Sequence, residues 1–217
     1  MSKKILILCT GNSCRSQMAH GFLQSFDTEL DVHSAGTRAS GKLNPKAVEV
    51  MKEAGIDISH HTSDNVEKYL NEEWDYVITV CGGANENCPV FSGKVKHRLH
   101  IGFDDPSDAT GTPEFIDSEF RRVRDEIKAT FYKFYQENIL LKYLNDRSDN
   151  IPICHCGGIT LGEIRGAVRA GCKEIKCVRD YTRKHKTGYC KELSPNRKCC
   201  HNRFNEIINQ LIVTNDE

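Results

Sequence analysis

The sequence predicts an α/β fold in which a four-stranded parallel sheet forms the middle of three layers, followed by a small all-α domain rich in cysteine. Two observations carry this prediction. Over roughly the first 140 residues, short apolar runs alternate with amphipathic stretches, which is typical of parallel strands covered by helices on both faces. After that point the alternation stops, and the rest of the chain holds seven of the eleven cysteines. We therefore expect two domains with separate chemistry.

The elements of the first domain follow in order along the chain. Apolar runs predict strands at residues 4–8, 30–33, 75–80 and 98–103. Helices are expected at residues 16–25, 44–55, 63–70 and 112–134. Asn44 and Pro45 suit the N-cap and first turn of the second helix, and Gly55 suits its end. Because ligands of such sheets bind beyond the carboxyl ends of the strands, Cys9 and Cys81, which follow two of these ends, are candidate site residues.

A polar stretch that ends in proline predicts the boundary between the two domains. We expect a first domain of residues 1–143, a linker of residues 144–152 and a second domain of residues 153–217. In the second domain, Thr160 and Glu163 have capping-box spacing and open a helix that Gly171 ends. Two further helices are expected, at residues 173–182 and around residues 204–211.

Composition excludes several classes of protein. Lys and Arg total 30, as do Asp and Glu, so the net charge is +0 and gives no reason to expect nucleic acid or an anionic membrane as partner. No stretch approaches the roughly 20 apolar residues of a membrane span. The apolar run after the N-terminus is too short for a signal peptide, so we expect a cytoplasmic protein. In that compartment, many cysteines indicate redox chemistry or metal binding rather than a disulfide scaffold.

The first candidate site is the segment CTGNSCRS, which leads from the first strand into the first helix. Such a turn directs backbone N–H groups and the positive end of a helix dipole toward one point, which suits a tetrahedral oxyanion. Arg15 adds a planar donor pair, and Cys9 in this positive field is expected to be a nucleophilic thiolate. The expected oxyanion-binding residues are Thr10, Gly11, Asn12, Ser13, Cys14, Arg15 and Ser16. The alternative is a buried cysteine beside an ordinary turn.

A thiolate that attacks an oxyanion needs an acid for the leaving oxygen. Asp105 is the candidate, because it follows a predicted strand and the proline after it holds it extended. Asp104 is the less favoured neighbour, and an acidic turn without catalytic role is the alternative.

The cysteine–arginine loop and the later Asp-Pro resemble the low-molecular-weight protein tyrosine phosphatases. The fuller pattern resembles one branch of that superfamily, the thioredoxin-coupled arsenate reductases. The resemblance covers about residues 1–138 and rests on CTGNSCRSQMA, SAGT, NPKAVEVMKE, IDISHHTSD, CGGANENCP and GFDDP. It implies that Cys9 attacks arsenate, that Cys81 displaces arsenite by forming a disulfide with Cys9, and that Cys88 then pairs with Cys81. Thioredoxin would reduce the final disulfide.

A tyrosine phosphatase with redox-regulating cysteines is the main alternative, and an oxyanion sensor is a second one. Tyrosine phosphatases commonly carry aromatic residues after the Asp-Pro, where this chain has Ser107 and Asp108. Some family members bind potassium near the loop with a glutamate where this chain has His20. Because histidine is a poor ligand for a hard monovalent cation, we predict no potassium site.

The second candidate site lies in the cysteine-rich domain. The segment CHCGGITLGEIRGAVRAG resembles the [2Fe-2S] domain of bacterioferritin-associated ferredoxins, although the Cys-x2-Cys that follows in that family is missing here. The resemblance implies a [2Fe-2S] cluster, with zinc as the alternative and a metal-free domain as a third reading. The expected ligands are Cys154, Cys156, Cys190 and Cys199, with Cys200 as the alternative to Cys199. Cys172 and Cys177 are expected in the helical core.

Overall fold

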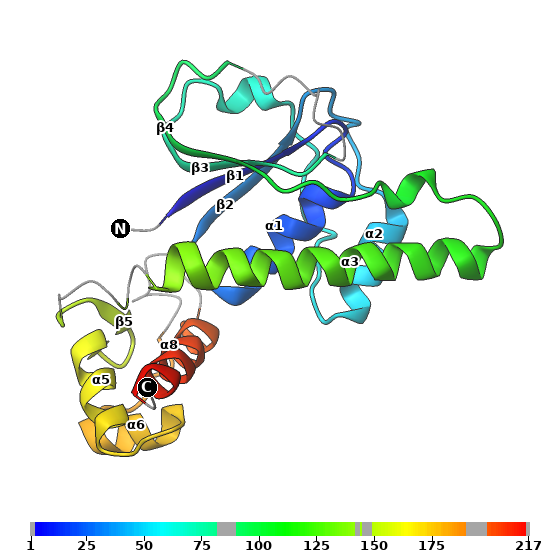
Figure 1. Ribbon diagram of the computed structural model, residues 1–217. Coiled ribbons are helices and arrows are strands. Elements are labelled where there is room, and N and C mark those ends of the chain that lie inside the picture. The colour runs from blue at the N-terminus through cyan, green and yellow to red at the C-terminus, as the bar shows by residue number, and fades with distance from the viewer. Residues whose placement is uncertain (1–2, 82–89, 142–143, 145–148, 190–198, 216–217) are drawn as a thin grey trace. The chain divides into compact units, whose positions relative to one another are not determined.

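The computed structural model describes residues 3–81, 90–141, 144, 149–189 and 199–215. The chain forms two compact units (Figure 1). The first comprises Met1–Ser25 and Leu30–Lys133, and the second comprises Phe26–Glu29 and Phe134–Glu217. The linker expected at residues 144–152 stays a prediction, because residues 145–148 lie outside the described part of the chain.

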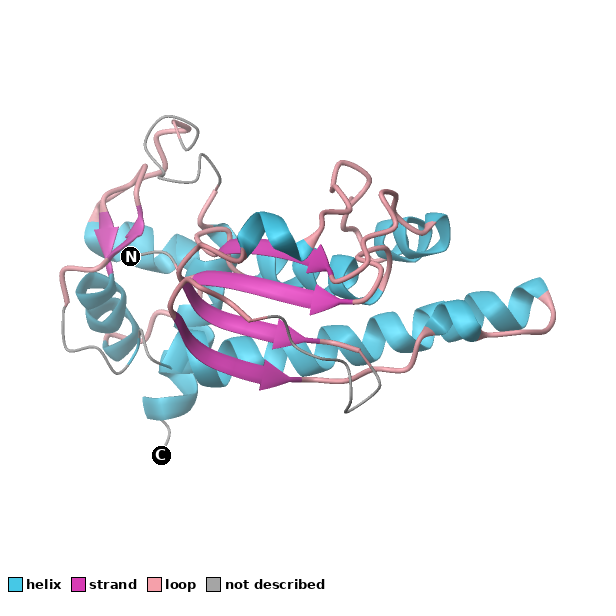
Figure 2. Cartoon of the chain, turned by 90° about the horizontal axis from the view of Figure 1, so that it is seen from above, coloured by secondary structure: helices cyan, strands magenta, loops and turns pink. Residues whose placement is uncertain are grey.

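The first unit contains the four-stranded parallel sheet that the sequence predicts. Its strands are β1 (Lys4–Cys9), β2 (Asp31–Gly36), β3 (Trp74–Thr79) and β4 (Val95–His100), in the order β2-β1-β3-β4. All neighbours are parallel, with Cys9 opposite Gly36 and Leu8 opposite Thr79. The carboxyl ends of the strands therefore meet at one edge, as the parallel arrows of Figure 2 show.

The fourth strand begins three residues before its predicted position. It is an edge strand that pairs only with β3, and its side chains are mostly exposed and polar. No apolar run therefore marks it, whereas the apolar residues at its predicted position come after the strand has ended.

Helices cover both faces of the sheet, as predicted, but the long helices all lie on one face (Figure 1). They are α1 (Arg15–Phe26), α2 (Pro45–Glu53) and α3 (Pro113–Tyr135). The opposite face is covered by the short 3-10 helix η1 (Val66–Tyr69) and by Phe91. The helix expected at residues 63–70 is only this single turn, because the side chain of Asn65 accepts from the amide of Glu67 and fixes a late start.

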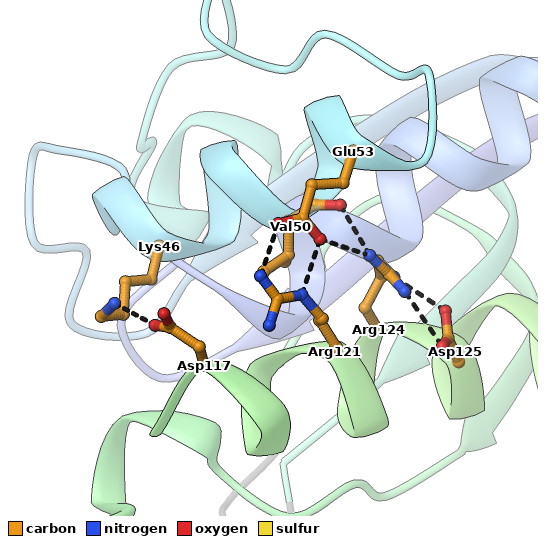
Figure 3. A network of polar contacts seen from close by, with 7 residues as sticks. All are labelled: Lys46, Val50, Glu53, Asp117, Arg121, Arg124 and Asp125. Carbon is orange, nitrogen blue, oxygen red and sulfur yellow. Dashed lines mark hydrogen bonds and ion pairs between the residues drawn. The ribbon is translucent and has the colours of Figure 1, made fainter. Parts of the chain in front are cut away.

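Helix α3 is held on α2 by packing and by a network of charged side chains (Figure 3). Arg121 donates to both carboxylate oxygens of Glu53 at 2.7 and 2.8 Å, and Arg124 donates to the carbonyl of Val50 at 3.0 Å. Lys46 forms an ion pair with Asp117. Exposed pairs of this kind contribute little each, and α3 also buries an apolar face in the first unit. That face contains Val123, Ile127 and Phe131.

The second unit contains helices α5 (Leu161–Arg169), α6 (Ile175–Thr182) and α8 (His201–Asn215). The prediction of an all-α domain was wrong, because β5 (Pro152–Cys154) and β6 (Ile159–Thr160) form a two-stranded antiparallel sheet. Gly158, with a φ of 62°, lets the chain reverse between these strands. The predicted capping box of α5 is confirmed, since both the Thr160 and the Glu163 hydrogen bonds are present.

The core of the second unit lies between α5, α8 and the small sheet. Its buried side chains include Ile153, Ile159, Leu161, Ile164, Ala167, Phe204 and Ile207. Cys172 is buried in the core, as expected, and forms a disulfide with the half-buried Cys177 across the turn between α5 and α6. Within the described ranges, no helix has the length and apolar character required to cross a bilayer.

Candidate functional site

The nucleophile loop, residues 9–16, joins the last residue of β1 to the first turn of α1. Cys9 is 4% exposed, and its Sγ lies 3.0 Å from Oγ of Ser16 and accepts the amide of Asn12 at 3.1 Å. The structure thus places Cys9, Asn12 and Ser16 together, as the sequence predicts.

Asn12 holds the loop in its curved form. Its backbone has a φ of 46°, and its side chain is completely buried. The amide nitrogen Nδ2 donates to Oγ of Ser16 at 3.0 Å, and Oδ1 accepts the backbone N–H of Asp64 at 2.8 Å. Asparagine tolerates the left-handed region better than most residues, which explains its use at this position.

The carbonyl groups of the loop are bound by residues outside it. Backbone amides of Arg38, Ser40 and Asn44 donate to the carbonyls of residues 10, 11 and 13 at 2.8 to 2.9 Å. Gln17, completely buried, donates to the carbonyls of Asn12 and Thr62. Since each peptide is planar, a carbonyl that points outward turns the next N–H the opposite way, toward the pocket. The loop amides can therefore receive an oxyanion.

Sequence analysis missed two residues of this support. Gln17 resembles an ordinary polar helix residue, and only its burial reveals its function. Gly36 lies across from Cys9 in the parallel register, and a Cβ atom there would lie 2.6 Å from the carbonyl oxygen of Thr10. Gly36 belongs to the SAGT segment of the resemblance, which was the one signal that could have identified it.

Arg15 and Asp105 face each other beside the loop. Nη1 of Arg15 donates to the carbonyl of Phe103 at 3.0 Å, and Nη2 forms an ion pair with Asp105. The other carboxylate oxygen of Asp105 accepts the amide of Ser107 at 3.0 Å, at the start of the short 3-10 helix η2 (Pro106–Asp108). Asp104 instead pairs with Arg122 on the surface. The structure therefore brings Asp105, rather than Asp104, to the guanidinium of the loop.

A pocket of about 580 Å³ opens above the nucleophile loop. It is lined by Cys9, Thr10, Gly11, Ser13, Cys14, Arg15, Asp104, Asp105, Ser107 and Asp108. Among these lining residues Arg15 is the one cation, and the carboxylates are those of Asp104, Asp105 and Asp108. A tetrahedral anion seated on the loop amides would thus have a guanidinium and a carboxyl group at its edge.

A second cysteine lies within the nucleophile loop, and a third lies beside it. Cys14 is buried, and its burial, together with the charge of Asp105, raises the pKa of its thiol, so it stays protonated. Cys81 follows β3 and is also buried, and its Sγ lies 3.8 Å from Oγ1 of Thr10. A second thiol therefore lies beside the residue next to the nucleophile. Cys88 lies outside the described residues.

The second unit brings three sulfurs together, which we call the sulfur site: Cys154, Cys156 and Cys200. Sγ of Cys154 lies 3.9 Å from Sγ of Cys156 and shares a hydrogen bond with Cys200. That bond lowers the pKa of Cys154 to about 5, with help from the amide of Gly157 and the charge of Arg179, and it raises the pKa of Cys200. The hydrogen bond therefore favours ionisation of Cys154 over ionisation of Cys200.

The remaining predicted ligands of the second site are placed differently. Cys199 is exposed, and its carbonyl accepts a hydrogen bond from Thr28, whereas Cys200 is 5% exposed. Cys190 lies outside the described residues. In the part of the chain that the structure describes, no set of three or more His, Cys, Asp or Glu side chains is arranged to hold a metal ion. The gathered thiols nevertheless have the soft donor chemistry that iron–sulfur clusters and zinc require.

Comparison with known proteins gives consistent matches to the first part of the chain. A profile of the family described as low molecular weight phosphotyrosine protein phosphatase matches residues 4–142. An arsenate reductase of Shouchella clausii is 54% identical over 136 residues, which are 62% of this chain and 96% of that protein. An arsenate reductase of Bacillus subtilis is 52% identical over 127 residues, 58% of this chain and 90% of that protein. A solved arsenate reductase in the phosphate binding state has a TM-score of 0.54 at 32% identity and covers 62% of this chain and 98% of that chain.

Proposed function

Because the chain belongs to the low molecular weight phosphotyrosine protein phosphatase family and its relatives include arsenate reductases, we propose that it reduces arsenate to arsenite. The observation that carries the proposal is the pair of buried thiols at neighbouring strand ends, Cys9 in the anion-binding loop and Cys81 beside Thr10. A phosphatase of this kind needs the first thiol alone. Reduction of arsenic needs a second thiol, which forms a disulfide with the first and so releases two electrons to arsenic.

In the first step of the proposed mechanism, the thiolate of Cys9 attacks the arsenic atom of arsenate. The loop amides and the guanidinium of Arg15 bind the remaining oxygens, in a pocket where such donors act more strongly than in water. Asp105 protonates the oxygen that leaves as water. For this step, Arg15 must release part of its ion pair with Asp105 and bind arsenate instead. The carboxyl group of Asp105 then lies at the edge of the substrate.

In the second step, the thiolate of Cys81 attacks the sulfur of Cys9 in the adduct. The S–S bond forms, the S–As bond breaks, and its electron pair leaves with arsenic, so As(V) becomes As(III). Cys88 then attacks Cys81, which frees Cys9 and leaves a Cys81–Cys88 disulfide. An external dithiol of the thioredoxin class returns the two electrons and two protons.

For the second unit, we propose that it binds a [2Fe-2S] cluster, with zinc as the alternative metal. The ligands would be Cys154, Cys156, Cys190 and one of the two adjacent cysteines. The burial of Cys200 and its bond to Cys154 support Cys200 over Cys199. When bound, such a cluster supplies one electron at a time. The chain's own residues would hold it in the turn between β5 and β6 and at the start of α8.

The test of the reductase is arsenate-dependent NADPH oxidation by the full chain with thioredoxin and thioredoxin reductase. Cys81→Ser and Cys88→Ser are expected to stop multiple turnover, while Cys199→Ser, which replaces an exposed thiol outside this pocket, leaves it in place. Cys88→Ser with full turnover would contradict the three-cysteine sequence.

The second candidate function is that of a phosphatase with regulatory cysteines. The carboxylate of Asp105 beside Arg15 favours it, because this acid would serve a phosphate ester equally well. Hydrolysis of p-nitrophenyl phosphate is the comparison assay. A high rate that neither Cys81→Ser nor Cys88→Ser changes, together with no arsenate turnover, would establish the phosphatase instead.

A further inference from the structure

Arg179, on α6, reaches into the sulfur site. Its Nη2 donates to Sγ of Cys154 at 3.6 Å. Its other terminal nitrogen, Nη1, is buried and has no hydrogen-bond partner among the described residues. An unpaired N–H of a guanidinium is costly to bury, so the position of this nitrogen calls for an acceptor.

The surroundings of Cys154 show what kind of acceptor would fit. Its sulfur also receives the backbone N–H of Gly157, and the turn wraps it so closely that a Cβ at Gly157 would lie 3.2 Å from Sγ. Several donors thus converge on one sulfur. Convergent donors to cysteine sulfur are how proteins stabilise sulfur-ligated centres that carry negative charge and how they set the reduction potential of these centres.

We propose that Arg179 is a positioning residue of the sulfur-ligated centre, with one nitrogen fixed on Cys154 and the other held for an acceptor that the bound centre supplies. This inference rests on the cluster proposed for the second unit. Reduction of a [2Fe-2S] centre adds one electron and breaks no bond, so its negative charge grows by one. A buried guanidinium in contact with a ligand sulfur offsets that charge and favours the reduced form.

The test compares three variants of the full chain, purified without oxygen. Arg179→Gln removes the charge, Arg179→Lys keeps the charge but loses the planar pair of donors, and Arg169→Gln removes an exposed charge from α5 as the matched control. Iron and sulfide per chain are measured first, and circular dichroism checks the fold. The midpoint potential is then found by titration with dithionite and mediators, followed by visible absorption.

We expect Arg179→Gln to lower the ratio of reduced to oxidised centre about tenfold at the wild-type midpoint potential, which for a one-electron couple is a shift of about 59 mV. Arg179→Lys is expected to lower it about threefold, and Arg169→Gln to leave it unchanged. If Arg179→Gln binds no cluster, the proposal is tested by Arg179→Lys instead. A threefold fall in its ratio of reduced to oxidised centre supports the proposal.

Three results would overturn the inference, and they are distinguishable. Wild-type chain without iron and sulfide, or with zinc in their place, means that the cluster itself is absent. A loaded Arg179→Gln variant with the wild-type potential means that the cluster is present but Arg179 does not act on it. An unchanged potential in Arg179→Lys, where Arg179→Gln does not load, leads to the same conclusion.

Discussion

The nucleophile loop and the sulfur site both begin with a cysteine that ends a β-strand, yet they are assembled in different ways. Cys9 ends β1, and the two groups that hydrogen-bond its sulfur, from Asn12 and Ser16, come from the next seven residues. Cys154 ends β5, but its neighbours come from a turn, from Arg179 on α6 and from Cys200, 46 residues away. A site made by one continuous segment can be recognised in the sequence, whereas a site made by several elements needs their packing.

The largest expected effect is that of Cys9→Ser, which should abolish the activity of the first site and leave the second site unchanged. Cys9→Ser replaces the nucleophile with a group that ionises far less readily, and we expect kcat for arsenate reduction to fall by roughly four orders of magnitude or more. The iron content of the second unit should not change. A steady-state assay and an iron determination on the same preparation test both statements, and residual activity within tenfold of wild type would refute the assignment of Cys9.

Arg15→Lys sharpens the comparison within the first site. Lysine keeps the charge but cannot offer two parallel donors, so the contacts to the oxyanion and to the carbonyl of Phe103 cannot both be kept. We expect kcat/KM for arsenate to fall about 100-fold. Steady-state kinetics at varied arsenate concentration measure this change, and a loss below fivefold would mean that charge alone is enough.

Cys14 contrasts with Cys154, because its environment keeps the thiol neutral. Burial holds its folded-state pKa above the ordinary value, so it contributes stability below about pH 9 that is lost as the pH rises further. Between pH 8 and pH 10, wild type should lose about 1 kcal/mol more free energy of unfolding than Cys14→Ala does. Urea unfolding at the two pH values measures the difference, and equal slopes would mean that Cys14 ionises normally.

The smallest expected effect concerns the helix that follows the turn of the sulfur site. Thr160→Ala removes the side chain that accepts the amide of Glu163, which should cost about 1 kcal/mol or somewhat less in the opening of the first turn of α5. Thr160→Ser keeps the hydroxyl and serves as the control. Hydrogen exchange of the α5 amides reports the change, and equal protection in all three proteins would show that the cap contributes nothing.

Much of the first unit could be predicted from the sequence, because its signals are local. Apolar runs gave three of the four strands in place, and the Asn44-Pro45 start of α2 is where it was expected. Strand β4 was displaced because an exposed edge strand has no apolar run. Asp105 was chosen for its place after a predicted strand and before Pro106, but its contact with Arg15, across 90 residues, has no local signal in the sequence.

The second unit was harder to predict, since its determinants are not local. The spacing of Thr160 and Glu163 identified α5, but nothing in the sequence distinguishes Cys199 from Cys200 as neighbours of Cys154. That difference arises just before α8 begins, where the side chain of Cys199 is exposed to solvent and that of Cys200 is buried. The Cys172–Cys177 disulfide likewise depends on how the turn between two helices brings the sulfurs together.

The residue type at position 36 is constrained, although Gly36 does not line the pocket of the first unit. A methyl group there would collide with the backbone of Thr10, which is main chain and cannot rotate away. Inheritance of this glycine is therefore tied to inheritance of the loop, and a lineage that lost the nucleophile would be free to replace both. Saturation mutagenesis at this codon under arsenate selection should return glycine alone, and recovery of alanine would show that the loop can yield.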